Sequence, residues 1–152
     1  MIDVDKIKTL REKTGAGIAQ CREALDATKG DSKNAEEWLL EKGILKAAKK
    51  AERETTQGVV EAYVHGAGKI GVLVEVACET DFVAKTDDFK ALAHELAMQV
   101  SAMNPKNDAE LLKQPYIRDP KLTVDALIKA TIAKLGENIR VKHFVRMELG
   151  EE

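Results

Sequence analysis

Residues 59–78 read VVEAYVHGAGKIGVLVEVAC, and larger apolar side chains recur at every second position along much of this stretch. A period of two places alternate side chains on opposite faces of a β-strand. The turn would lie at residues 66–69, GAGK, where glycine can adopt the positive φ that tight turns need. The stretch therefore predicts a β-hairpin with one strongly apolar face, formed by Ile70, Val72, Val74, Val76 and Cys78.

The residues after this hairpin predict two helices and a last strand. Helical spacing of apolar residues runs from Phe89 to Val100, and Asn104-Pro105 ends it. A polar connection over 106–121 carries one short helical piece near 109–113, and a helix with Thr123 as N-cap and Gly136 as C-cap follows. The last strand is expected to place one set of side chains on a single face: Ile139, Val141, His143, Val145, Met147 and Leu149. The predicted fold is α+β, a small antiparallel sheet packed on helices.

The residues before the hairpin predict a small helical bundle. Apolar residues at helical spacing indicate three short helices, separated at residues 14–17 and at Gly30-Asp31, with the third closed by Gly43. A charged helical stretch with little apolar periodicity follows. We therefore expect a helical bundle over 1–43, a helical linker over 44–55 and an α+β core domain over 56–152.

The second face of the predicted sheet suggests a homodimer. We expect Leu73 to point away from the apolar face of the hairpin, beside Val59 and Tyr63, and Phe144 to lie opposite the main apolar face of the last strand. The helices can cover only one side, and leftover apolar surface usually marks an interface. Pairing through the core sheet across a two-fold axis would cover it; the alternative is a monomer whose second face is sufficiently polar.

Composition and charge narrow the function classes. The chain has 152 residues, a formal net charge of -2 and 4% aromatic residues, so neither a basic field nor a stacking platform for nucleic acid is evident. The N-terminus lacks the pattern of a secretory signal, and no stretch reaches transmembrane length. Cys21 and Cys78 are expected to be buried thiols in a reducing compartment. We expect a cytoplasmic protein with no direct contact to nucleic acid or membrane.

No pattern of catalytic or metal-binding residues emerges. His65, His94 and His143 are scattered, and no cysteine lies at ligand spacing. Neither a Ser-His-Asp nor a Cys-His arrangement is indicated. We therefore expect no enzyme activity, no metal and no cofactor.

Three segments together resemble the elongation factor Ts family. They are residues 10–18, LREKTGAGI; residues 79–85, ETDFVAK; and residues 135–139, LGENI. The resemblance implies a three-helix bundle of ubiquitin-associated type joined to a core domain, both binding the GTPase elongation factor Tu and promoting GDP release and its exchange for GTP. Longer members often carry a second copy of the core half and a coiled-coil insertion, and no repeat of the 59–89 pattern is found here.

The resemblance also implies a set of functional residues. The segment that intrudes into the partner and displaces its Mg²⁺ corresponds to Thr80, Asp81, Phe82 and Val83. The residues expected to contact the partner lie on the N-terminal turn, the hairpin turn and the segment before the last strand: Arg11, Thr14, Gly15, Gly17, Ile18, His65, Gly66, Leu135 and Gly136.

Two of these interpretations have competing ones. Taken without the resemblance, Phe82 is better interpreted as a plug in its own core, because apolar residues usually lie inside; Asp81 beside it favours an exposed turn, and could itself be an N-cap. For the whole chain, the alternative function is a ubiquitin-associated-type adaptor that binds proteins without exchange activity.

Overall fold

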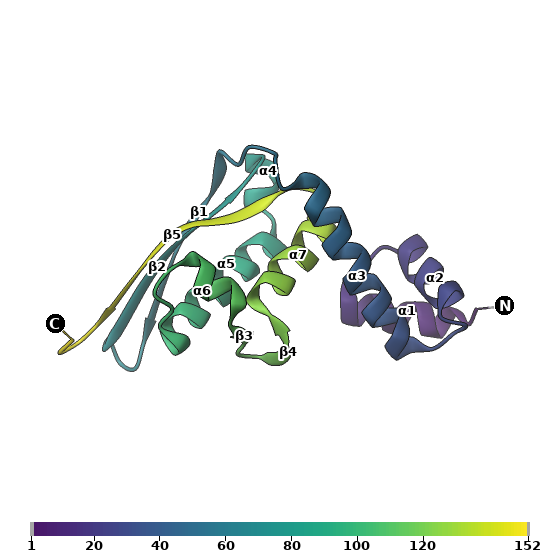
Figure 1. The fold of residues 1–152 in the computed structure, drawn as a ribbon, viewed down its shortest axis with the longest axis horizontal. Helices are drawn as coiled ribbons and strands as arrows, with labels where there is room; N and C mark the ends of the chain where they lie inside the picture. Colours follow the sequence, from purple (N-terminus) through teal and green to yellow (C-terminus); the bar gives the residue numbers. More distant parts are fainter. Residues whose placement is uncertain (1, 152) are drawn as a thin grey trace.

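The computed structural model describes residues 2–151, and it has a helical bundle at one end and a sheet with its covering helices at the other (Figure 1). The bundle contains α1 (Val4–Thr14), α2 (Ile18–Ala27) and the first part of α3 (Ser32–Lys50). The remaining elements are β1 (Gln57–His65), β2 (Ile70–Cys78), α4 (Asp81–Ala84), α5 (Asp87–Met103), α6 (Asp108–Lys113), β3 (Pro115–Tyr116), β4 (Asp119–Thr123), α7 (Val124–Leu135) and β5 (Ile139–Glu148). The α+β prediction is confirmed.

The predicted hairpin forms the centre of the structure. Strands β1 and β2 pair antiparallel from Gln57 opposite Cys78 to His65 opposite Ile70, and β5 pairs antiparallel with the other edge of β2. The alternation in β2 buries Val72, Val74 and Val76, as predicted. Strand β2 is thus central, with one face turned toward the helices.

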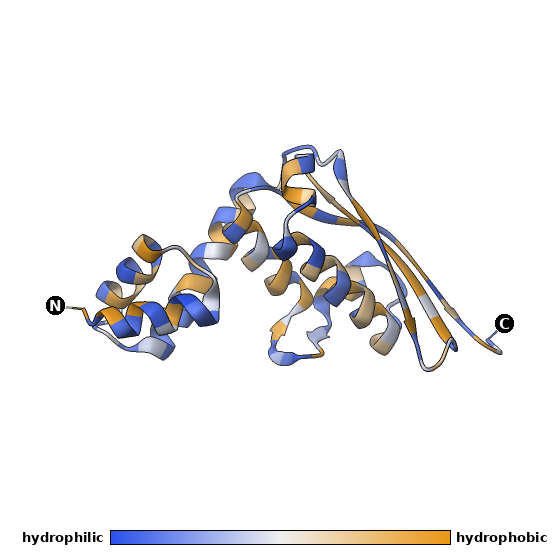
Figure 2. Cartoon of the chain, turned by 180° about the vertical axis from the view of Figure 1, so that it is seen from behind, coloured by the Kyte–Doolittle hydropathy of each residue, from blue (hydrophilic) through white to orange (hydrophobic). Residues whose placement is uncertain are grey.

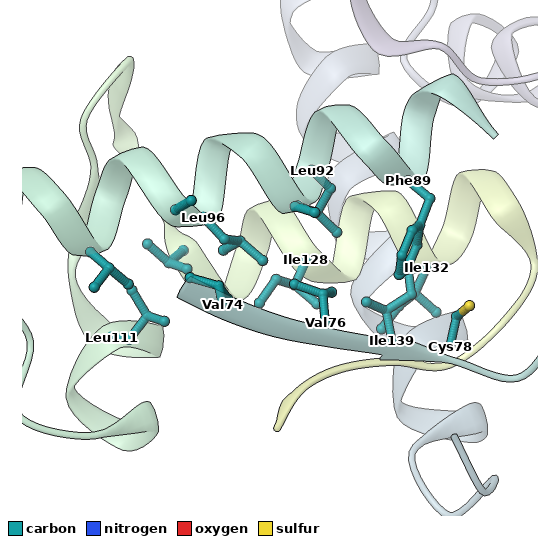
Figure 3. Close-up of a cluster of buried hydrophobic side chains, with 14 of the residues drawn as sticks. Val74, Val76, Cys78, Phe89, Leu92, Leu96, Leu111, Ile128, Ile132 and Ile139 are labelled. Atoms are coloured by element: carbon teal, nitrogen blue, oxygen red, sulfur yellow. The ribbon is translucent and has the colours of Figure 1, made fainter. Parts of the chain in front are cut away.

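The main core lies between this sheet and helices α5 and α7. Phe89, Leu92 and Leu96 on α5 meet Val74 and Val76 on β2, and side chains of α7 and of β5, which lies beside β2 in the sheet, join the same cluster (Figure 3). The residues of the cluster drawn and labelled there include Cys78, Leu111, Ile128, Ile132 and Ile139. The helical spacing from Phe89 to Val100 was therefore interpreted correctly.

A β-bulge in β5 overturns the prediction for the last strand. Glu75 pairs with His143 but Val76 pairs with Val141, so Lys142 has no partner in β2. The extra residue reverses which side chains face inward. Ile139 and Val141 pack on the core before the bulge and Phe144 does so after it, whereas His143 and three further residues of the predicted face are exposed: Val145, Met147 and Leu149.

The outer face of the sheet is apolar and uncovered within this chain. We call it the outer sheet face: Val60, Ala62, Val64, Leu73, Val145 and Met147, of which Leu73 is 51% and Met147 73% exposed. The register places Leu73 opposite Ala62 and Val145, not beside Val59 and Tyr63, which pack on the core; that part of the prediction was wrong. Figure 2 shows hydrophobic residues along the strands as well as on the helices.

The bundle has its own small core, separate from the first. Leu10, Cys21, Ala24, Leu25 and Ala35 are buried together there. Its helix ends follow the predicted signals: α1 ends at Gly15 with φ 68°, and the Asp31 carboxylate accepts a hydrogen bond from the N–H of Asn34 at 2.9 Å at the start of α3.

The prediction that Gly43 ends the third helix was wrong. Helix α3 continues through Gly43 to Lys50 and packs along α7. A Cβ at Gly43 would lie 3.3 Å from the Cβ of Ala133, so the missing side chain allows the two helices to approach closely. Ala47, one turn later, is buried in the main core.

A short ribbon of β3 and β4 was missed in the connection over 106–121. The side-chain amide of Gln99, fully buried on α5, donates to the Pro115 carbonyl at 3.0 Å, and its oxygen accepts from the N–H of Ile117 at 3.0 Å. The Glu95 carboxylate accepts from the Tyr116 hydroxyl and from Arg118 Nε, each at 2.7 Å. Polar side chains of α5 therefore attach the ribbon, and α6 lies where the short helical piece was predicted.

Candidate interaction site

The short helix α4 presents an aromatic side chain to solvent. Phe82 is 80% exposed. Phe89, seven residues later, is fully buried and fills the core beneath the corner that α4 forms between β2 and α5. The interpretation of Phe82 as a core plug was therefore wrong, and Phe89 takes that role. An exposed large aromatic residue on an ordered element is typical of a contact with another protein.

Hydrogen bonds around Thr80 begin helix α4. The Thr80 hydroxyl oxygen is the N-cap acceptor for the N–H of Val83 at 3.3 Å, so Thr80 and not Asp81 caps the helix. Asp81 forms an ion pair with Lys85 one turn later at 3.0 Å. The hydrogen bond and charge of Lys85 lower the pKa of Asp81 below its ordinary value. This exposed carboxylate is therefore a negative charge beside Phe82 at neutral pH.

The start of α4 is also attached to the segment after α7. The Glu137 carboxylate accepts two hydrogen bonds from Thr80, from its N–H at 2.9 Å and from its hydroxyl at 2.7 Å. In return the Glu79 carboxylate accepts from the N–H of Asn138 at 2.8 Å. We call these paired carboxylates the Glu79–Glu137 clamp.

The N-terminal turn lies between α1 and α2 and presents a second apolar residue. Ile18, the first residue of α2, is 60% exposed, next to Gly17 as N-cap. Arg11 is exposed on the last turn of α1, and the Thr14 hydroxyl donates back to the Leu10 carbonyl at 2.7 Å. Gly15 lies against Lys134 of α7, since a Cβ there would meet the lysine Nζ at 2.6 Å.

The predicted site residues are only partly brought together. Leu135 and Gly136 end α7 between Lys134, which lies beside the N-terminal turn, and Glu137, which holds Thr80. His65 and Gly66 lie elsewhere, at the hairpin turn, about 25 Å along the nine-residue strands from α4. The structure thus shows two neighbouring regions and one remote one.

The sequence reasoning missed the residues that hold the site. Glu79, Glu137 and Asn138 stood inside the matching segments, but no role was predicted for them. The available signal was an acidic residue directly before Thr80 and another directly after the Gly136 cap. Only the antiparallel pairing of β2 with β5 brings these two corners together.

Outside this site, the two cysteine thiols are buried. Burial raises the pKa of Cys21 and of Cys78, and the Glu137 carboxylate raises that of Cys78 further, so both thiols stay protonated at neutral pH. Among residues 2–151, no three metal-ligating side chains are grouped as a metal site would require. Nor does any helix in that range have the length and apolar character needed to cross a membrane.

These features define a class: an α+β protein with an N-terminal helical bundle that binds other proteins. Its exposed apolar residues, Phe82 on α4 and Ile18 at the start of α2, form the kind of surface that contacts other proteins. The family model described as elongation factor TS matches residues 5–106 and 79–152. The Elongation factor Ts of Heliobacterium modesticaldum is 42% identical over 196 aligned residues, covering 99% of this chain and 91% of that protein. For the protein of the same name from Carboxydothermus hydrogenoformans the identity is 43%, with 99% and 90% covered.

The chain therefore belongs to the elongation factor Ts family, whose members act in protein biosynthesis. The Elongation factor Ts of Coprothermobacter proteolyticus is similar to the same degree, at 43% identity over 99% of both chains. These aligned stretches exceed the 152 residues of this chain, so the relatives carry residues without a counterpart here.

Proposed function

We propose that this protein is the guanine-nucleotide exchange factor of elongation factor Tu, binding its GDP form and promoting release of GDP in exchange for GTP. The observation that carries the proposal is the exposed Phe82 on α4, within a chain of the elongation factor Ts family. The action forms and breaks no covalent bond, needs no cofactor and takes place in the cytoplasm, without contact to nucleic acid or membrane.

Exchange of this kind follows from linkage. A factor that binds the nucleotide-free GTPase more tightly than the GDP form must weaken GDP binding by the same ratio. Shifting the partner from almost entirely closed to almost entirely open takes about 5.5 kcal/mol. Burying one phenylalanine contributes about 3 kcal/mol at most, so Phe82 needs further contacts from elsewhere on the chain.

The wedge is the segment Thr80, Asp81, Phe82 and Val83. Mg²⁺ demands near-ideal octahedral geometry, so a small displacement of the partner's groups around it weakens its binding. Insertion of Phe82 between elements of the partner would cause such a displacement. The ionised Asp81, paired with Lys85, would hold a negative charge beside the place where Phe82 inserts.

The remaining contacts would come from the other predicted residues. The N-terminal turn, with Arg11, Thr14, Gly15, Gly17 and Ile18, would supply affinity, and His65, Gly66, Leu135 and Gly136 would add contacts from the core. We keep the division into a bundle over 1–43, a linker over 44–55 and a core domain over 56–152, and the two separate cores support its two ends. The proposed linker is the second half of α3 and the residues after it, and its Ala47 packs in the main core.

Replacing Ile18 by alanine should weaken binding to elongation factor Tu about tenfold, with the maximal rate of GDP release unchanged. The reason is that an exposed anchor residue is worth roughly 1–2 kcal/mol when buried at an interface, while the wedge remains intact. Titration of the exchange rate against protein concentration measures both quantities. The matched control is Val4→Ala: Val4 is about as exposed as Ile18 but begins α1, at the end of that helix away from the N-terminal turn. A change in the maximal rate alone would contradict the docking role of Ile18.

We also propose a homodimer formed through the outer sheet face. Six apolar residues from three strands share that face, and no element of residues 2–151 covers it. Two such faces related by a two-fold axis would form a sheet-on-sheet interface. The bulge in β5 supports this arrangement because it turns Val145 and Met147 toward the same side as Leu73.

Leu73→Asp should convert this dimer into a monomer. Leu73 lies on the middle strand, so the charge would be buried without a partner at the centre of the interface. Light scattering at micromolar concentration should give twice the 16.7 kDa of one chain for the wild type and 16.7 kDa for the variant. Ile117→Asp, on the β3–β4 connection, should remain dimeric; a monomeric wild type would rule the dimer out.

The second candidate is an adaptor of ubiquitin-associated type, suggested by the bundle alone. A pull-down from bacterial lysate separates the two. An exchange factor should retain one GTPase of translation and lose it when GDP and Mg²⁺ are added in excess, since these favour the closed partner. An adaptor would retain its partners regardless of nucleotide.

A further inference from the structure

We propose that Glu137 and Glu79 are positioning residues that hold the wedge in its active orientation before the partner is met. This inference rests on the proposed exchange function, in which Phe82 acts on the partner. Neither carboxylate was among the predicted site residues, and neither needs to touch the partner for this role. Their action is exerted through the backbone of Thr80.

The geometry of the clamp is reciprocal. Glu137 accepts from the N–H and the hydroxyl of Thr80, at 2.9 and 2.7 Å, while Glu79 accepts from the N–H of Asn138 at 2.8 Å. Each carboxylate therefore binds the backbone of the residue that follows the other. Hydrogen bonds to an ionised acceptor are among the stronger ones in proteins, and two on one residue restrict both its position and its rotation.

Helix α4 needs this support because it cannot fix itself. It has four residues, Asp81–Ala84, and one turn of helix is not stable alone. Phe82 is 80% exposed, so its own packing holds it only weakly. The clamp fixes Thr80, which caps Val83 and thereby sets the direction in which α4 leaves the strand.

The same clamp reaches the end of α3. The buried Asn138 side-chain amide donates to the carbonyls of Ala51 at 3.4 Å and Arg53 at 2.8 Å, and the Arg53 guanidinium lies 3.5 Å from Glu79. Helix α3 carries the bundle at its other end. The clamp thus joins the wedge to the element that carries the N-terminal turn, so that both contacts are presented in one fixed arrangement.

The first test is made on the protein without its partner. In Glu137→Ala, the amides of Val83, Ala84, Lys85 and Thr86 should lose about tenfold in hydrogen-exchange protection, as expected for the loss of a charged hydrogen bond. Glu137→Gln keeps an acceptor for the Thr80 N–H and should retain most of the protection. Unchanged protection in the alanine variant would overturn the proposal, and so would a glutamine variant as weak as the alanine one.

The second test is a double-mutant cycle on GDP release from elongation factor Tu. Glu137→Ala should lower the maximal rate about tenfold in the wild-type background and have no further effect in Phe82→Ala, because it acts through Phe82. Equal effects in both backgrounds would show a general loss of structure and overturn the proposal. Glu95→Ala also removes a carboxylate that accepts two hydrogen bonds, at the remote β3–β4 ribbon, and should leave the maximal rate unchanged.

The two tests separate this inference from the proposed function. A wild-type protein that does not accelerate GDP release would refute the exchange function. The hydrogen-exchange measurement would still decide whether the clamp holds the α4 corner.

Discussion

Phe82→Ala should lower the maximal rate of GDP release from elongation factor Tu by up to about 100-fold, since fully burying a phenylalanine contributes about 3 kcal/mol. Binding to the partner should weaken less than the rate falls, because the wedge is engaged mainly in the open state. Release of a fluorescent GDP analogue, titrated with the variant, yields both numbers.

The fold of this variant should be unaffected, which makes the result interpretable. Phe82 is 80% exposed, and surface substitutions usually change the free energy of unfolding by less than about 0.5 kcal/mol. Phe82→Leu keeps an apolar side chain and should lose less activity. A variant that releases GDP at the wild-type rate would show that Phe82 is not the wedge.

Phe89→Ala should produce the opposite pattern, a loss of stability of about 3–5 kcal/mol. Phe89 is fully buried where α5 meets the end of β2, with Cys78, Ile132 and Ile139 near it (Figure 3). Its removal leaves a cavity beneath the corner that carries α4. Urea unfolding followed by far-UV circular dichroism measures the change.

The bundle supplies an internal control for that experiment. Trp38 is the only tryptophan and packs on the bundle core, so its fluorescence reports the bundle and not the main core. The loss of unfolding free energy in Phe89→Ala should be larger when followed by circular dichroism than when followed by Trp38 fluorescence. A change below about 1 kcal/mol in both signals would contradict the assignment of Phe89 as the core plug.

Local patterns in the sequence were sufficient for most of the fold. The period of two in residues 59–78 and the helical spacing from Phe89 to Val100 each report which side chains are buried, and the structure follows both. Thr123 and Gly136 bound α7 for local reasons, a side-chain acceptor and a positive φ.

The errors arose where distant segments decide the structure. The residues from Ile139 to Leu149 were interpreted as one regular alternation, although polar His143 and apolar Phe144 interrupt it. Burying Phe144 against the helices requires the bulge at Lys142. Gly43 has the usual signature of a helix end, yet its role depends on Ala133, ninety residues later.

The candidate site was predictable only through the resemblance. Without the resemblance, the general tendency of apolar residues to lie inside favoured a buried Phe82, and the neighbouring Asp81 was only a weak local signal for an exposed turn. The clamp was beyond reach for another reason: Glu79 and Glu137 lie 58 positions apart, and only the pairing of β2 with β5 brings them together.

The most direct test of the exchange function is release of fluorescent GDP from elongation factor Tu in the presence of Mg²⁺, with and without the wild-type protein. The proposed mechanism predicts acceleration by orders of magnitude that saturates with protein concentration. It also predicts a smaller acceleration when Mg²⁺ is removed beforehand, because the protein then no longer has to displace that ion from the partner. A release rate that does not change with added protein would contradict the exchange function.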